Sequence, residues 1–289
     1  MTKAISAWQR FRRDRPAVIG SGVLLIFILA VALGPLVYSA SYDEIDFARA
    51  TSAPSWQHLL GTNDLGQDQL ARLLWGGRVS IAVGLTAMLV SISLGTLVGM
   101  LAGFCGGIVD NVLMRVTDLF LSLPQLPLLL LIIYLFREPM RNLVGPEAGI
   151  FVLIILVIGG LTWMPTARLV RAGFLSVKEQ AFVQAARSLG AHPVRIVCWH
   201  ILPNVIGPVI VAATLGVGNA IITESTLSFL GIGFPPDVPT WGRMLYDAQN
   251  YVASASYLVI APGLAIFLTV LSVNYLGDGL RDALDVKSQ

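Results

Sequence analysis

Six long apolar stretches without a single charged side chain constrain the fold of this chain more than any other feature of its sequence. An α-helix needs about 20 apolar residues to cross the hydrocarbon core of a bilayer. A spanning segment must also satisfy its own backbone hydrogen bonds, which favours helices. The sequence therefore predicts an all-α, polytopic membrane helix bundle with six transmembrane helices, at residues 17–38, 80–103, 119–136, 149–164, 205–223 and 257–275.

The composition agrees with a membrane protein and excludes several functions. Of the 289 residues, 55% are hydrophobic and 12% are charged, and the net charge of +2 argues against a nucleic-acid partner. None of the three lysines (Lys3, Lys178 and Lys287) stands in a Gly-Lys-Ser/Thr context, so any nucleotide hydrolysis must occur on another chain. We expect Cys105 and Cys198 to be reduced, apolar filler residues.

The distribution of basic residues predicts the orientation in the membrane. Residues 1–16 are rich in Lys and Arg, and the apolar run that follows is too long for a typical signal peptide, so we interpret it as a retained first helix. Six spans with both termini in the cytoplasm place most Lys and Arg residues on the cytoplasmic side, as the positive-inside rule requires. The same topology places the polar stretch 178–204 in the cytosol.

This stretch, 178–204, has the pattern of a folded, water-exposed element. Residues 179–189 are mostly good or middling helix formers, and Gly190 follows as a natural C′ residue. Phe182, Ala186 and Leu189 fall at i, i+4 and i+7 and predict one narrow apolar face. His192–Pro193 marks a turn, since the residue before proline is pushed out of the α region.

The order of small residues in this stretch resembles the EAA loop of ABC importer permeases. The resemblance rests on Gln184-Ala185-Ala186, on Gly190 and on Leu202-Pro203, with Gln184 in place of the usual Glu. It implies that the helix docks on an ATP-binding subunit, with a close approach at the alanines and the glycine. The implied coupling residues are Phe182, Gln184, Ala185, Ala186, Arg187, Leu189, Gly190, Leu202 and Pro203.

Three more segments narrow the resemblance to the permeases of dipeptide, oligopeptide and nickel importers. These are residues 61–84, with Gln67 where that family usually has Arg, residues 224–242, and the tail 274–285. The resemblance implies the type I importer permease fold, also called MetI-like. The first span and its outer segment, within residues 1–74, resemble the C-type subunit, and residues 75–285 are then the five-helix permease core.

The resemblance also implies a function and a set of partners. The chain is expected to carry peptides across the cytoplasmic (inner) membrane of a prokaryote by alternating access, with nickel chelates or glutathione-like compounds as alternative cargo. A B-type permease paralogue would complete a heterodimer, and two ATP-binding subunits would hold ATP and Mg²⁺. An extracytoplasmic substrate-binding protein would deliver the cargo. The chain itself is expected to bind no cofactor and to catalyse no reaction.

Two groups of residues are expected to be structural. The turn at residues 61–68 is rich in Gly and Asx residues, and we favour capping and turn roles for Asp64 and Asp68 over metal binding. Gly95, Gly99 and Gly103 recur every four residues, which predicts a smooth helix face for close packing rather than a substrate contact.

The two polar segments beside the third span are interpreted as connections. Residues 110–118 are expected to be a short link in which Arg115 and Asp118 pair at i, i+3. Residues 137–148 are expected to be a short outer loop.

Three residues are candidates for gating or for lining a transport path. Pro124 and Pro127 lie in the third apolar run, where a proline bends a helix, although simple kinking explains them equally well. Glu224 follows the fifth run, and a carboxylate at a membrane boundary is costly unless it is solvated or paired. We expect Glu224 in a water-filled cavity, in a structural role slightly more than in substrate binding.

Two other functions were weighed. An ion-coupled secondary transporter needs charges inside the membrane, and none of the predicted spans contains one. A membrane-embedded hydrolase needs a nucleophile with a base, or a set of metal ligands. The three histidines, His58, His192 and His200, are assigned to an outer segment and to the coupling loop, so neither a catalytic set nor a metal site can be assembled.

Overall fold

The computed structural model describes residues 7–284, and within this range it contains helices and loops but no strand. Four helices exceed 20 residues and are apolar enough to cross a membrane alone: α2 (Arg15–Val37), α3 (Gln69–Cys105), α10 (Leu202–Phe229) and α12 (Tyr257–Leu284). The remaining helices are α1 (Ala7–Arg13), α4 (Gly107–Ser122), α5 (Gln125–Val144), α6 (Pro146–Gly160), α7 (Met164–Val177), α8 (Ala181–Ser188), α9 (Pro193–Arg195) and α11 (Trp241–Ala248).

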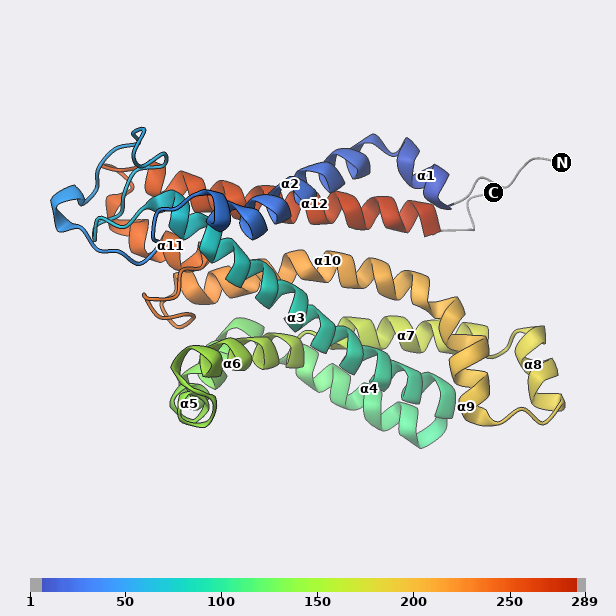
Figure 1. Cartoon of the computed structure of the whole chain (residues 1–289). Helices are drawn as coiled ribbons and strands as arrows, with labels where there is room; N and C mark the ends of the chain where they lie inside the picture. Colours follow the sequence, from blue (N-terminus) through green and yellow to red (C-terminus); the bar gives the residue numbers. More distant parts are fainter. Residues whose placement is uncertain (1–6, 285–289) are drawn as a thin grey trace.

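Two bent helix pairs complete the set of spans. α4 and α5 meet at 89° and α6 and α7 at 44°, and if each pair is one span the described part of the chain has up to six. The predicted all-α membrane bundle is therefore confirmed. α1, α8 and the end of α12 lie at one end of the bundle, which we call the α8 end; α11 and the 38–68 segment lie at the other, the α11 end (Figure 1).

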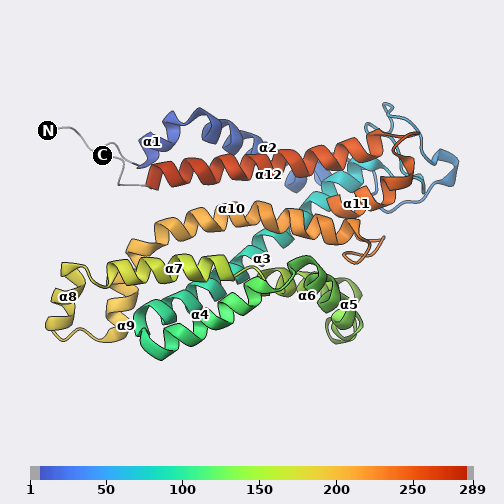
Figure 2. The same cartoon turned by 180° about the vertical axis from the view of Figure 1, so that it is seen from behind.

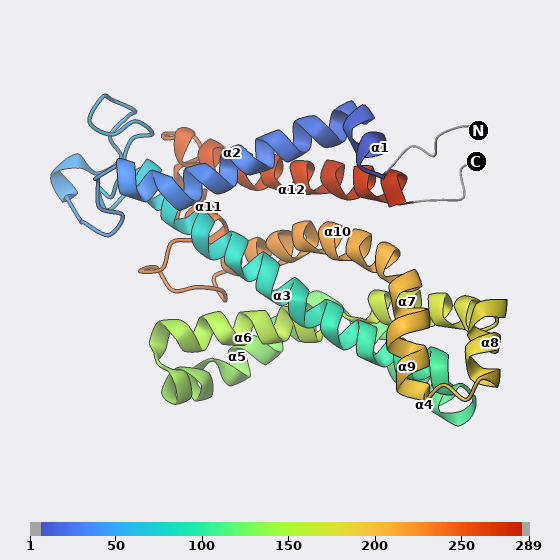
Figure 3. The same cartoon turned by 45° about the vertical axis from the view of Figure 1, so that its right-hand side comes forward.

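The helix α3 forms the axis of the bundle. It crosses obliquely from the α11 end to the α8 end and contacts α2, α6, α7 and α10 (Figure 3). The proposed division of the chain at residues 74 and 75 falls inside this helix and remains a prediction.

The third span is not the single kinked helix that we predicted. α4 ends at Ser122, Leu123 is extended with ψ 142°, and Pro124 is the N-cap of α5. Leu123 precedes a proline, which disfavours the helical region for it and so ends α4 there. Pro127 lies in the first turn of α5, where its missing N–H would have had no helical partner in any case. The prolines therefore separate two helices instead of bending one.

The two predicted connections are also helical. Residues 110–118 lie inside α4, and Asp118 pairs with Arg168 of α7 (Nη2 to Oδ1 2.5 Å) instead of with Arg115. Residues 137–144 continue α5 as far as Gly145, whose φ of +103° reverses the chain into α6. Charged residues misled the prediction here, because most of them lie on the surface of a helix and Asp110 is buried in an ion pair with Arg171.

The glycine stripe of α3 lies directly against α7. A Cβ atom added at Gly95 would lie 2.6 Å from Thr166 Cβ, one at Gly99 2.4 Å from the carbonyl oxygen of Ala167, and one at Gly103 2.5 Å from Phe174 Cβ. Side chains at these positions would push α7 away, so the two helices approach this closely only because the stripe has no side chains.

We predict that Gly99→Leu destabilises the protein by about 1–3 kcal/mol, the usual cost of overpacking. The control is Gly22→Leu in α2, where an added Cβ meets no atom within 4 Å. The measurement is the temperature at which the detergent-solubilised protein loses its monodisperse size-exclusion peak. An equal melting temperature for the two variants would contradict the close contact.

Candidate functional site

The predicted coupling stretch forms two short helices at the α8 end. α8 ends in a Schellman motif: the N–H of Gly190 donates to the carbonyl of Arg187 (3.0 Å) and that of Ala191 to the carbonyl of Ala186 (3.1 Å). Gly190 has φ +76°, a conformation that glycine adopts without strain. After it, His192 caps α9 and Pro193 begins that helix.

Gln184 makes contacts that the usual Glu could not make. Its Nε2 donates to the carbonyl oxygen of Lys178 (3.2 Å) and lies 3.5 Å from a carboxylate oxygen of Glu179. A carboxylate at this position has no hydrogen to donate and would lie beside a second negative charge. The departure from the EAA pattern is therefore accommodated locally, inside the loop.

The two faces of α8 differ in what covers them. Val183 is fully buried against a cluster that includes Phe174 of α7 and Val205 of α10. Phe182 (45% exposed) and Leu189 (87% exposed), the predicted apolar pair, lie on the outer surface. The structure thus leaves the predicted apolar face of α8 uncovered.

The sequence indicates a second amphipathic stretch at residues 194–202, but not that its apolar side chains form an exposed surface next to α8. Val194 and Trp199 are 62% and 77% exposed and line an open hollow of about 710 Å³, together with His192, Arg195, Cys198 and His200. Residues Ile196–Ile201 form a π-helical turn before Leu202-Pro203 opens α10. The tryptophan in this amphipathic stretch was the residue from which an exposed apolar surface could have been predicted.

α8 is joined to the bundle through α7. Arg171 of α7 makes a bidentate ion pair with Asp110 of α4 (2.5 and 2.6 Å), and Lys178 donates to the carbonyl of Gly103 (3.1 Å). Paired N–H bonds of this kind fix orientation as well as distance. Figure 2 shows α7 between α10 and α4, and α7 also contacts α3.

Glu224 is not in the water-filled position that we expected. It lies inside α10, is fully buried, and accepts hydrogen bonds from Ser80 Oγ of α3 (3.1 Å) and Ser228 Oγ (2.8 Å). Ser80 Oγ in turn accepts the N–H of Trp241 in α11 (3.2 Å). The fifth span is longer than its apolar run, so the carboxylate lies in the interior and connects α3, α10 and α11.

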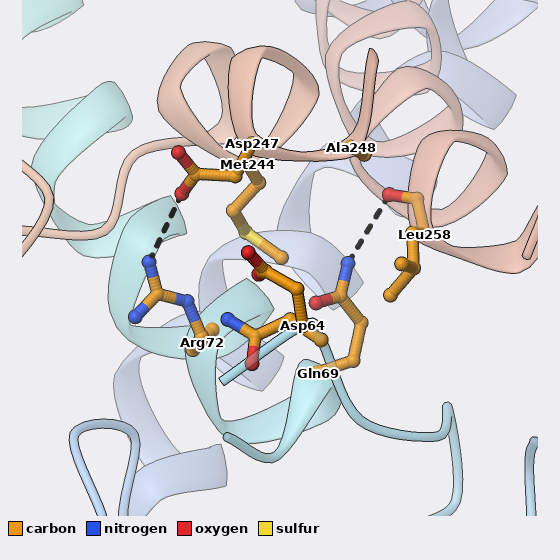
Figure 4. A pocket seen from close by; sticks show the side chains of 8 residues that line it. Asp64, Gln69, Arg72, Met244, Asp247, Ala248 and Leu258 are labelled. Carbon is orange, nitrogen blue, oxygen red and sulfur yellow. Dashed lines mark hydrogen bonds and ion pairs between the residues drawn. The ribbon is translucent and has the colours of Figure 1, made fainter. Parts of the chain in front are cut away.

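A buried charged network closes the α11 end (Figure 4). Arg72 is 2% exposed, donates to Gln67 Oε1 (2.6 Å) and pairs with Asp247 of α11 (3.5 Å). Burial raises the pKa of Asp247, although Arg243 and Arg72 oppose this. The hollow between these residues has a volume of about 10 Å³, room for roughly one water molecule.

The surroundings of this network explain why position 67 is Gln rather than Arg, and they show what Asp64 and Asp68 of the turn contact. An Arg at position 67 would place a second cation against Arg72, whereas Gln67 supplies an acceptor. Asp68 caps α3 (Oδ1 to the N–H of Ala71, 2.8 Å) and bonds His58 (2.8 Å). Asp64 lines the small hollow. Across residues 7–284 no group of His, Cys, Asp and Glu residues could hold a metal ion.

Comparison with known proteins identifies the family. Residues 95–288 match the model described as the binding-protein-dependent transport system inner membrane component, and residues 4–54 match the N-terminal TM domain of oligopeptide transport permease C. The chain belongs to this family of inner-membrane permease components. These are ABC importer permeases, and they are not themselves enzymes.

Several relatives match almost the whole length of the chain. It is 36% identical to the dipeptide transport system permease protein DppC of Alkalihalophilus pseudofirmus, covering 98% of this chain and 91% of that one. It is 37% identical to the glutathione transport system permease protein GsiD of Pectobacterium atrosepticum (97% and 90%). It is 36% identical to the oligopeptide transport system permease protein OppC of Haemophilus influenzae (98% and 90%).

A solved structure supports the predicted MetI-like fold. The MetNI methionine ABC transporter, in an inward-facing conformation, matches with a TM-score of 0.56 and 20% identity over 71% of this chain and 93% of that chain. At this identity the similarity concerns the fold of the permease.

We predict that Glu224→Leu lowers stability by about 1–3 kcal/mol, because the buried hydroxyls of Ser80 and Ser228 lose their acceptor. Glu224→Gln keeps an acceptor and a donor of the same length, and we expect it to cost less. The test is thermal unfolding of both purified variants. Equal losses in the two variants would show that the hydrogen bonds are unimportant.

Removing the buried cation Arg72 should also be costly. We expect Arg72→Leu to destabilise the protein by about 1–3 kcal/mol, because Gln67 and Asp247 each lose a charged hydrogen-bonding partner. Asn63 still contacts Gln67, and Arg243 still pairs with Asp247. The matched control is Arg49→Leu, which removes an exposed ion pair with Asp46, worth about 0–1 kcal/mol, and an exposed contact with His58. Thermal unfolding of the two variants, side by side, measures the difference, and similar losses would argue against the network.

Proposed function

We propose that the chain is the C-type permease subunit of a peptide importer in the cytoplasmic membrane of a prokaryote, with its α8 end and both termini in the cytosol. The observation that carries this proposal is the uncovered apolar face of α8, a short helix whose opposite face packs on the bundle through Val183. The match to an oligopeptide permease C domain supports the C-type assignment.

The partners follow from the same proposal. A B-type paralogue forms the other half of the membrane unit, and two ATP-binding subunits dock on the coupling helices and hold ATP and Mg²⁺. A substrate-binding protein presents cargo at the α11 end. Phe182 and Leu189 are suited to act as the apolar anchors of the docking contact, since buried apolar side chains dominate such interfaces. Ala185 and Ala186 allow close approach.

In the proposed mechanism, this chain transmits a movement from the ATP-binding subunits to the membrane helices. Closure of the ATP-binding subunits displaces α8, the rigid ion pairs pass the displacement to α4 and α7, and α7 moves against the glycine stripe of α3. The bundle then alternates between access from the α11 end and access from the α8 end. The chain supplies no chemistry to ATP hydrolysis.

Two cargo classes remain in competition. The relatives named for dipeptides and oligopeptides favour peptides, and the relative named for glutathione, at 37% identity, favours a γ-linked tripeptide. Uptake of a labelled dipeptide, competed with an unlabelled oligopeptide, glutathione or a nickel chelate, distinguishes them. We expect the dipeptide and the oligopeptide to compete best.

The docking role predicts a specific loss of function. We expect Ala186→Glu to insert normally, since Glu is a good helix former and this position is partly exposed, but to abolish ATP-driven uptake by placing a charge in the contact. Ala186→Ser, a small neutral change, is the control.

The measurement combines uptake with a pull-down of the tagged chain from its membranes and an ATPase assay of the product. Recovery of ATP-binding subunits with the Ser variant but not with the Glu variant is the expected result. Normal uptake by a correctly inserted Glu variant would overturn the coupling assignment.

A further inference from the structure

A groove runs along α10 outside the coupling loop. Two hollows, of about 620 and 450 Å³, share Leu169, Ala212 and Leu215 and so form one continuous depression, which we call the α10 groove. It extends from Thr223 to Gly207, about 24 Å along a helix with a rise of 1.5 Å per residue. This is most of the roughly 30 Å hydrocarbon thickness of a bilayer.

The wall of this groove is mainly apolar and carries a set of uncharged polar side chains in the larger hollow. The larger hollow, toward the α11 end, is lined by parts of α3, α5, α7 and α10, and its polar side chains are Gln125, Thr162, Thr166, Asn219 and Thr223. The only charged lining residue of the two hollows is Arg281, at the α8 end, which makes no ion pair within the described range.

Asn219 distinguishes this wall from a surface that faces lipid. The hydroxyls of Thr162 and Thr223 donate to carbonyls of the preceding turn, so their hydrogens are already used. The side-chain amide of Asn219, exposed in the middle third of α10, has no partner among residues 7–284. A bare amide in hydrocarbon costs several kcal/mol, so this position requires water or a hydrogen-bonding ligand.

The groove also has a movable floor. An added Cβ at Gly216 would lie 2.2 Å from Sδ of Met88, so the thioether of α3 rests directly on the backbone of α10. Methionine is unbranched and adapts to irregular shapes. The floor can therefore yield to ligands of different outline, while the polar groups above it stay in place.

We propose that the α10 groove is this chain's wall of the cargo path, and that the side-chain amide of Asn219 hydrogen-bonds the backbone N–H and C=O groups of a peptide. Gln125, whose Nε2 lies 3.5 Å from the carbonyl oxygen of Leu161, offers its side-chain oxygen as a second contact. A carboxamide offers one acceptor and two donors, which match the N–H and C=O of a peptide group whatever its side chain. Arg281 meets the carboxylate of a peptide that leaves at the α8 end. This inference rests on the proposed peptide importer and names the residues that contact its cargo.

The first test is the accessibility of an introduced cysteine. Cys105 and Cys198 are exposed, so both are changed to Ser in the parent. Asn219→Cys is compared with Leu89→Cys, which is exposed on α3 but does not line the groove. An anionic thiosulfonate reagent is added to inside-out vesicles that contain the whole transporter.

We expect Asn219→Cys to react at least about tenfold faster than Leu89→Cys, because a charged reagent does not enter lipid. Excess dipeptide should slow the reaction, and modification should block uptake. An unreactive Asn219→Cys means that lipid or a partner helix covers the groove, and this result overturns the inference. So does modification that leaves uptake unchanged.

The second test places a charge in the wall. With Asn219→Asp, we expect the uptake of a lysine-containing dipeptide relative to a glutamate-containing one to rise by about tenfold, through direct attraction in a partly dry groove. Asn219→Gln, which keeps the amide, should leave the ratio unchanged. A ratio that is the same for both variants contradicts a contact between Asn219 and the cargo.

Failure of the proposed function gives a different result. If the Cys-free parent hydrolyses ATP but takes up no peptide, the peptide assignment is wrong and the contact with peptide amides is wrong with it, whatever the labelling. If the parent takes up peptide and Asn219→Cys is inert, the importer assignment stands and only the groove is misassigned.

Discussion

The close contact between α3 and α7 is the interaction on which the rest of this structure depends. Three glycines, at 95, 99 and 103, bring the two helices within reach of each other's backbone, where larger side chains would hold them apart. α3 extends from the network at the α11 end, and α7 carries α8 at the opposite end. The hydrophobic effect gives helices little tendency to associate within lipid. Close van der Waals packing between α3 and α7 therefore holds the two ends of the bundle together.

This contact gives a physical route between the coupling loop and the groove. α7 contributes Thr166 and Leu169 to the groove, and the same helix is held to α4 by Arg171 and Asp110. Protein interiors are close-packed and deform little. A packed helix such as α7 is therefore expected to shift as a rigid body between discrete positions rather than to bend continuously. On the proposed mechanism, a displacement of α8 would reach the groove through α7.

The errors in the sequence interpretation concern where helices begin and end. The charges of residues 137–144 and Glu224 were assigned from the ends of the apolar runs, but α5 and α10 continue past those ends. Pro124 is the opposite case, because a helix ends inside an apolar run there. Glu224 is the clearest example, because Ser80 of α3 satisfies its carboxylate from a position 144 residues earlier in the chain. Residues far apart in sequence determined which polar groups were buried.

The sequence alone determined the approximate places of the spans that form α2, α3, α10 and α12, the glycine stripe, the end of α8 before Gly190 and the resemblance of the coupling loop. These depend on local chemistry: helix length against bilayer thickness, backbone freedom at glycine, and the spacing of small residues. Only the tertiary structure decided that Val183 faces inward while Phe182 and Leu189 face outward, that Arg72 is paired at the α11 end, and that Asn219 lies unpartnered in a groove. Burial and pairing are properties of several helices packed together, and no single helix contains them.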